Sequence, residues 1–362
     1  RIYGPESYGL MGVFMSIVGI LAPISALSYP IAIVLPKSDN DAIGIGKLSI
    51  CISLGLASFS GIIIFLFSES IVKLFNIEEV HSFLYLMPLV ILFSGLLQVT
   101  EQWLIRTKQF MVTARVTFLQ SLILNGSKVG IGLLYPLASI LIIITAIGNG
   151  LKAFMMIVFG KKYKVSKKRN NHRFLDLGKK YYDFPLYRAP QALLYAITQN
   201  LPVLMLASLF GPVSAGFYTL GRSVMSIPTQ LIGKSIGDVF YPKITEASNR
   251  GDDITKMIIK ATIALILLGI FPFGLVIIFG PWLFSVVFGS DWYIAGEYAR
   301  WISLFALFRF IHQPSVKTLP VISAQAFHLV FTIITLIVNI VSITIGFYLF
   351  SSDIIAVALF SI

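Results

Sequence analysis

The chain has 362 residues, of which 57% are hydrophobic and only 12% are charged, and its mean hydropathy is +0.87. Soluble domains hold roughly 45–50% apolar and about 25% charged residues, so this composition excludes a soluble fold and predicts an all-α membrane protein. The formal charge is +12, and Cys51 is the single cysteine, which excludes intrachain disulfides and thiolate metal cages. No metal, cofactor or catalytic residue is expected.

Apolar runs of the length that a bilayer core requires follow one another along the chain, and they predict at least eleven membrane-spanning helices. These spans are expected near residues 9–35, 48–67, 82–105, 114–135, 137–159, 184–210, 213–240, 257–280, 297–319, 325–349 and from 353 onward. Internal prolines such as Pro23, Pro228, Pro272 and Pro314 are expected to be tolerated, because neighbouring helices can satisfy the carbonyls that they free. A first helix before Arg1 and further chain after Ile362 are expected to be missing.

The lysines and arginines predict which connections face the cytoplasm. Five alternate connections hold 21 of these residues, whereas the other connections hold only 3. Positive connections stay cytoplasmic, so residue 1 is expected outside and the loop 161–183 inside. The basic run KKYKVSKKRNNHR at Lys161 is typical of a linker attracted to anionic headgroups, with a partner protein left open. Topology thus explains the basic charge, and no nucleic-acid partner is expected.

Two segments of the chain resemble each other at a fixed distance. YGPESYGLMGVFMSI near the start and FGPVSAGFYTLGRSVMSI after Leu209 share Gly, Pro, Ser, Gly and Ser at an offset of 207 positions. Both segments open spans that run in the same direction, which indicates a parallel repeat of two pseudo-symmetric six-helix lobes. The expected domains are an N-terminal lobe at 1–160, a basic linker at 161–183 and a truncated C-terminal lobe at 184–362.

Several segments of the sequence resemble those of a known protein family. RIYGPESYGL, PIAIVLPKSDNDA, KKYYDFPLYRAPQALLYAITQN and DVFYPKITEASNRGD resemble the polysaccharide-biosynthesis flippases of the multidrug/oligosaccharidyl-lipid/polysaccharide exporter superfamily. This resemblance implies a bacterial inner-membrane protein of 12 or more helices in two lobes. It also implies that the protein flips undecaprenyl-pyrophosphate-linked sugar units outward for lipopolysaccharide, O-antigen or capsule synthesis, with polysaccharide polymerases and glycosyltransferases as partners.

Charged residues within the spans are candidate sites, because an isolated charge at the bilayer centre costs about 2.5–3.5 kcal/mol on insertion scales. Arg222 and Arg309 are expected to line a cavity and to grip pyrophosphate oxygens. Two amides at helical spacing, Gln230 and Gln313, extend these polar faces. Structural pairing or snorkelling of the arginines is the alternative.

The remaining intramembrane candidates have two interpretations each. Lys128 lies within GSKVG, a pattern that equally predicts close helix packing, as does GKSIG at Gly233. Lys152 can contact substrate or snorkel to the cytoplasmic surface. Glu101 and His312 are candidates for an ion pair, for an interhelical hydrogen bond, or for coupling to a proton or sodium ion, with the membrane potential as a further driving force.

Three functions compete. Four intramembrane cations against one or two acids favour a flippase with an anionic lipid-linked oligosaccharide as substrate. A multidrug or metabolite antiporter of the same superfamily is the alternative, for which more intramembrane acids are expected. A membrane polysaccharide polymerase or ligase is disfavoured because the longest outer connection, from Phe279 to Ala295, is short.

Overall fold

A computed structural model describes residues 2–75, 78–160, 174–250, 252–319, 322 and 324–361, with side chains left undescribed at 74–75, 174–175, 230–239, 241–242, 249, 325–326 and 328. The described residues are almost entirely helical and contain no strand, which confirms the all-α prediction. The chain contacts divide into two units. The N-terminal unit is Leu10–Leu201 with Ile2, and the C-terminal unit is Pro202–Ile362 with Tyr3–Gly9. The division therefore falls inside helix α8, and the expected lobes at 1–160 and 184–362 stay a prediction.

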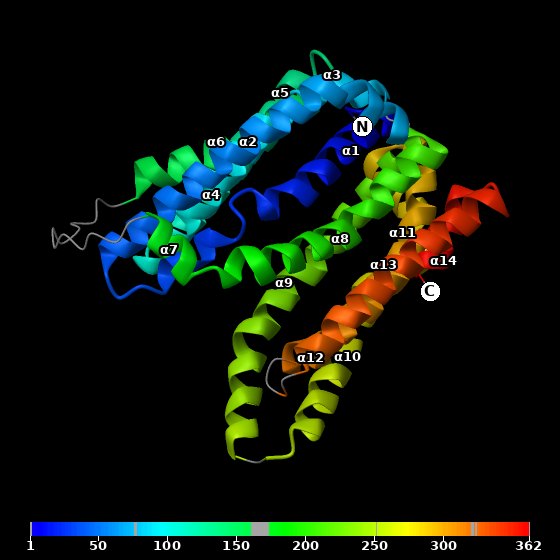
Figure 1. The fold of residues 1–362 in the computed structure, drawn as a ribbon. Coiled ribbons are helices and arrows are strands. Elements are labelled where there is room, and N and C mark those ends of the chain that lie inside the picture. The colour runs from blue at the N-terminus through cyan, green and yellow to red at the C-terminus, as the bar shows by residue number, and fades with distance from the viewer. Residues whose placement is uncertain are drawn as a thin grey trace. The chain divides into compact units, whose positions relative to one another are not determined.

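The N-terminal unit is a helical bundle in which α4 packs against both α2 and α6, and α6 also packs against α5 (Figure 1). Its long helices are α1 Pro5–Leu21, α2 Asp39–Phe75, α4 Met87–Arg106, α5 Phe110–Gly132 and α6 Ala138–Phe159. Short α3 His81–Leu84 and α7 Phe174–Lys180 accompany them. Leu177 of α7 is buried in a cluster with Tyr29, Ile33 and Ile45, so the end of the linker region is anchored on this unit.

The first predicted span, 9–35, is not one helix. It ends as an α-helix at Leu21 and continues as two short 3₁₀ segments, Ala22–Ile24 and Tyr29–Val34. Pro23 and Pro30 have no backbone N–H, and between them Leu27 and Ser28 take left-handed φ values of 47° and 59°. The amide of Gln98 on α4 donates to the carbonyl of Ala22 at 2.6 Å, which satisfies part of the interrupted backbone.

The C-terminal unit places α11 at its centre. Its helices are the end of α8 Ala189–Phe210, followed by α9 Pro212–Arg250, α10 Ile254–Phe288, α11 Tyr293–Ile311, α12 Gln313–Thr318, α13 Gln325–Tyr348 and α14 Asp353–Ser361. Helix α11 packs against α9, α10 and α14, and Tyr298 and Phe310 on it are fully buried. The predicted span 297–319 breaks between α11 and α12, just before Pro314.

Seven segments among the described residues are long and apolar enough to cross a bilayer, namely Pro5–Ile24, Asp39–Lys73, Met87–Arg106, Ala138–Phe159, Phe184–Phe210, Ile254–Phe288 and Leu329–Tyr348. The chain is therefore a multi-pass membrane protein. Helices α5, α9 and α11 coincide with three further predicted spans but are more polar than the seven segments. The expectation of at least eleven spans stays a prediction.

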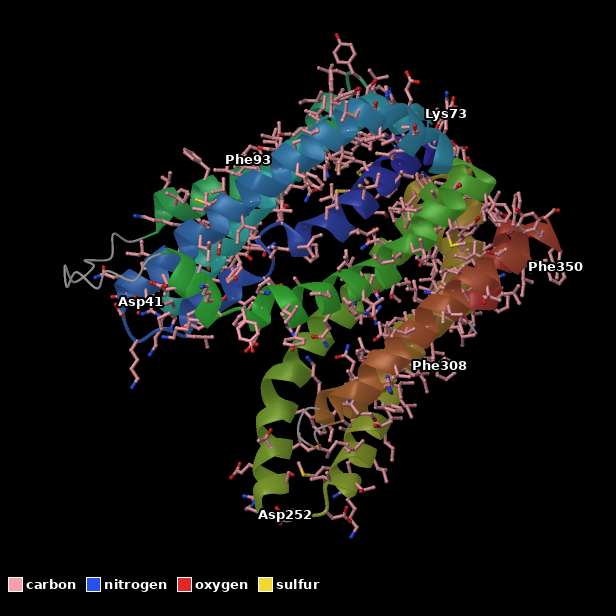
Figure 2. All side chains as sticks on the ribbon, viewed as in Figure 1. Asp41, Lys73, Phe93, Asp252, Phe308 and Phe350 are labelled. Carbon is pink, nitrogen blue, oxygen red and sulfur yellow. The ribbon has the colours of Figure 1, made fainter. Side chains whose placement is uncertain are left out.

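The two ends of α2 provide a test of sidedness. Lys37 precedes this helix and Lys73 lies in its last turn, and both residues are exposed; Figure 2 labels Asp41 and Lys73 near the opposite ends. In a Cys51→Ser background, whole cells treated with an impermeant thiol reagent are expected to label a cysteine at position 73 but not one at position 37. The reverse labelling pattern would overturn the predicted orientation.

Candidate substrate-binding sites

Two of the predicted site residues, Arg222 on α9 and Arg309 on α11, both lie near enough to Tyr218 to act on its phenol electrostatically. Helices α9 and α11 approach closely because Gly221 lacks a side chain: a Cβ there would lie 3.1 Å from Ile302 Cδ1. Tyr218 is buried and lies within electrostatic range of both guanidinium groups. Arg222 is half-buried and Arg309 is exposed. The C-terminal unit thus carries two cations in one region, and guanidinium groups are suited to an anionic group.

Tyr218 was missed by the sequence analysis. It lies one helical turn before Arg222, so the same spacing argument that linked Arg222 to Gln230 would have included it. Its ring meets that of Phe360 on α14 edge to face at 5.7 Å between centroids. This contact fixes the position of the Tyr218 ring.

The remaining candidates of this unit lie around the break between α11 and α12. His312 is exposed, and its ring lies 6.2 Å from that of Phe331 on α13. Gln313 is half-buried at the start of α12. The side chain of Gln230 and the GKSIG segment lie outside the described side chains. Substrate contact by Gln230 and Gln313 stays a prediction.

Glu101 and Lys152 form an ion pair across the α4–α6 interface of the N-terminal unit. Their Oε1 and Nζ atoms are 2.7 Å apart, and their side chains are 32% and 20% exposed. One turn away on α6, the amide of Asn149 donates to Ser94 on α4 at 3.0 Å. Among the candidate roles for Glu101, the structure shows the ion pair, and the charge of Lys152 is largely neutralised by it.

Lys128 is half-buried on α5, in the GSKVG segment that was also expected to pack closely against another helix. A Cβ added to Gly126 or to Gly130 would meet no atom of the described structure within 4 Å. Close packing through these two glycines is therefore wrong for the described part of the chain. The residues that face α6 lie on another side of the helix, as Gln120 shows by donating to the carbonyl of Gly148 at 3.4 Å.

A further arginine, Arg106, was counted only as a loop charge in the sequence analysis. Its Nε and Nη2 donate to Asp39 Oδ1 at 3.1 and 2.8 Å, and its Nη1 donates to the carbonyls of Ile33 and Pro36 at 3.1 and 2.7 Å. Arg106 thus holds the irregular segment before α2 onto the end of α4. An open cavity of about 370 Å³ lies beside this clamp, lined by Val34, Asp39, Ile105, Arg106 and Thr107.

The start of α1 crosses the start of α9 within the C-terminal unit. A Cβ on Gly9 would collide with the carbonyl of Pro212 and lie 3.0 Å from Gly216 N. Conversely, a Cβ on Gly216 would collide with the carbonyl of Pro5 and lie 3.0 Å from Gly9 N. The residues that recur in the predicted repeat therefore contact each other reciprocally.

Comparison with solved structures identifies the class of fold. One structure, described as the inward-facing conformation of a multidrug resistance MATE family transporter of the MOP superfamily, matches 99% of this chain and 87% of its own with a TM-score of 0.76 and 12% identity. At this identity the match shows the fold alone, that of a MATE-type helical membrane bundle. The comparison with curated proteins gave no significant match.

A comparison of the sequence with protein families identifies the family of the chain. Residues 1–295 match the family described as polysaccharide biosynthesis protein. The chain belongs to this family, and the resemblance noted from its motifs is confirmed.

Proposed function

We propose that this protein flips oligosaccharide units linked to undecaprenyl pyrophosphate from the cytoplasmic to the outer leaflet of a bacterial inner membrane. The observation that carries the proposal is that Arg222 and Arg309 both lie within electrostatic range of Tyr218. A lipid pyrophosphate must lose hydration to cross the bilayer, and two guanidinium groups can replace water as donors to its oxygens. Family membership supports a role in polysaccharide biosynthesis.

Alternating access between two lobes is the proposed mechanism, because parallel repeats are a known architecture of secondary transporters. Moving a bound lipid headgroup needs no covalent step, so we assign no catalytic residue and no cofactor. Coupling to a proton, a sodium ion or the membrane potential is part of the proposal. Polymerase or glycosyltransferase machinery is the proposed set of protein partners.

A multidrug or metabolite antiporter is the second candidate, since the matching structure is described as a multidrug resistance transporter. An antiporter for cationic drugs needs uncompensated acids in the membrane. Glu101, the acid deepest in a predicted span, is already paired with Lys152. The charges near Tyr218 are cationic, so the anionic, lipid-linked substrate is favoured.

The experiment that tests the function is removal of the protein from its own cells. We expect undecaprenyl-pyrophosphate oligosaccharide to accumulate on the cytoplasmic leaflet and to clear when the protein is restored. Accumulation on the outer leaflet would instead support a polymerase or ligase. A normal level of the intermediate combined with increased drug sensitivity would support the antiporter.

A further inference from the structure

We infer that Asp353, Ser214 and Tyr298 form a binding site for a monovalent metal cation, sodium, where helices α9, α11 and α14 meet. All three residues belong to the C-terminal unit. Binding of the ion does not depend on the proposed function. The role of sodium as the coupling ion rests on that function and names the ion that it left open.

Three oxygen-bearing side chains from three helices converge at this site. Ser214, in the first turn of α9, donates its hydroxyl to Asp353 Oδ2 at the start of α14 at 2.5 Å. The phenol of Tyr298 on α11 lies beside both of these side chains. Helix α11 packs against α9 and against α14. The site is therefore built by the packing of helices and not by the spacing of residues within one helix.

The phenol oxygen of Tyr298 is buried without a hydrogen-bond partner of normal geometry. Tyr298 is 0% exposed, and its ring packs edge to face on Phe217 at 5.9 Å between centroids. The oxygen is close to Asp353 and Ser214, yet it completes no hydrogen bond with any described residue. Buried polar groups of this kind are rare in native proteins and commonly mark the position of an ion or a water molecule.

The negative charge of Asp353 is not neutralised by a basic side chain in the described part of the protein, where this residue forms no ion pair. Its half-buried carboxylate accepts from Ser214 and from the backbone N–H of Ile354. A carboxylate offers about four lone-pair sites, so it retains capacity for a cation. Its place at the N-terminus of α14 suits a carboxylate by itself, but this does not account for the phenol of Tyr298.

The chemistry of the three side chains suits sodium. A carboxylate, a hydroxyl and a phenol provide oxygen ligands, which hard cations prefer to nitrogen or sulfur. One formal negative charge balances a single positive charge, whereas divalent cations are usually held by more than one carboxylate. A proton would need only the carboxylate and would make no use of the phenol. The monovalent metal ion is therefore favoured.

The same two helices connect this site with the arginines of the proposed headgroup site. On α9, Ser214, Tyr218 and Arg222 follow one another at intervals of four residues and lie along one side of the helix. On α11, Tyr298 and Arg309 are about three turns apart and share a side. At about 1.5 Å per residue, the separation is roughly 12 Å along α9 and roughly 16 Å along α11. An ion that holds these helices together at one end therefore acts on the helices that carry both arginines.

Thermal stability in detergent tests whether sodium binds. Sodium chloride is expected to raise the unfolding midpoint above that in choline chloride at the same ionic strength, because a ligand bound only by the folded state stabilises it. Asp353→Asn is expected to lose this shift. Asp291→Asn, at an exposed acid of the same unit, is the matched control and should keep it. Equal midpoints of the unchanged protein in the two salts would overturn the site, and a pH dependence that Asp353→Asn removed would then assign Asp353 a proton instead.

Tyr298→Phe separates ion binding from packing, because it keeps the ring and removes only the phenol oxygen. In choline chloride its midpoint is expected to equal or exceed that of the unchanged protein, since an unpartnered buried hydroxyl is lost. The sodium concentration that gives half of the shift is expected to rise about tenfold with the loss of one ligand. A lower midpoint in choline chloride with an unchanged response to sodium would give the phenol a structural role and overturn its place in the site.

Binding of a short-chain prenyl pyrophosphate in lipid nanodiscs tests the coupling. Sodium is expected to weaken this binding at least about fivefold, because an inward ion gradient drives a lipid outward only if the two ligands replace each other. Asp353→Asn should bind the probe equally in both salts. If sodium stabilises the protein but does not weaken probe binding, the ion site stands and the coupling is wrong. If the probe binds in neither salt while the sodium shift persists, the headgroup site of the proposed function is wrong and the ion site stands.

Discussion

Replacing Arg222 or Arg309 by Ala is expected to abolish export of the lipid-linked oligosaccharide while protein abundance stays near normal. The two guanidinium groups share the surroundings of Tyr218. Truncating either one removes a charge-assisted hydrogen-bond donor from the headgroup site, and each such bond contributes about 1.5–3 kcal/mol. Lys at either position is expected to restore export only in part, because an ammonium group lacks the bidentate geometry of Arg.

The measurement is the amount of oligosaccharide on the outer leaflet, normalised to the amount of protein in the membrane. Arg250→Ala is the matched control. Arg250 is 60% exposed at the end of α9 and pairs with Glu246 and Asp252, and such surface pairs contribute about 0–1 kcal/mol. Full export by both Arg222→Ala and Arg309→Ala would contradict the proposed headgroup site.

The helices themselves could be predicted because hydropathy and length determine a membrane helix almost locally. The interruptions could not be predicted fully: Pro23 and Pro314 were expected to be tolerated within their spans, but the structure ends a helix near each. Whether a proline bends or stops a helix depends on which neighbour satisfies the freed carbonyls. At Ala22 that neighbour is Gln98, 76 residues away in sequence.

The candidate sites could likewise be predicted only where contacts between distant segments were not needed. Depth in a span made Arg222 and Arg309 candidates, because burying a charge in a membrane is costly whichever helix carries it. The partner of Glu101 was not determined in this way, since four intramembrane cations were available and only packing of α4 on α6 selects Lys152. Arg106 was missed because its acceptors, Asp39 and the carbonyls of Ile33 and Pro36, become neighbours only after the chain has folded.

Gly9→Ala and Gly216→Ala are each expected to destabilise the protein by about 1–3 kcal/mol, the range for forcing extra atoms into a well-packed site. At both positions the added Cβ would collide with a backbone carbonyl, of Pro212 or of Pro5. A flexible side chain could rotate away from such a collision, but a backbone carbonyl can move only with its helix. The start of α1 and the start of α9 would therefore have to separate.

The measurement is the thermal stability of the purified protein in detergent, with Gly4→Ala as the control in the same segment. Gly4 is exposed, and a Cβ there would meet no atom of the described structure within 4 Å, so its replacement should change stability little. Because the collisions are reciprocal, Gly9→Ala and Gly216→Ala disturb one contact, and the double variant is expected to lose less stability than the two single losses added together. Strict additivity of the two losses, or an effect of Gly4→Ala as large as theirs, would show that the two glycines do not form a shared crossing.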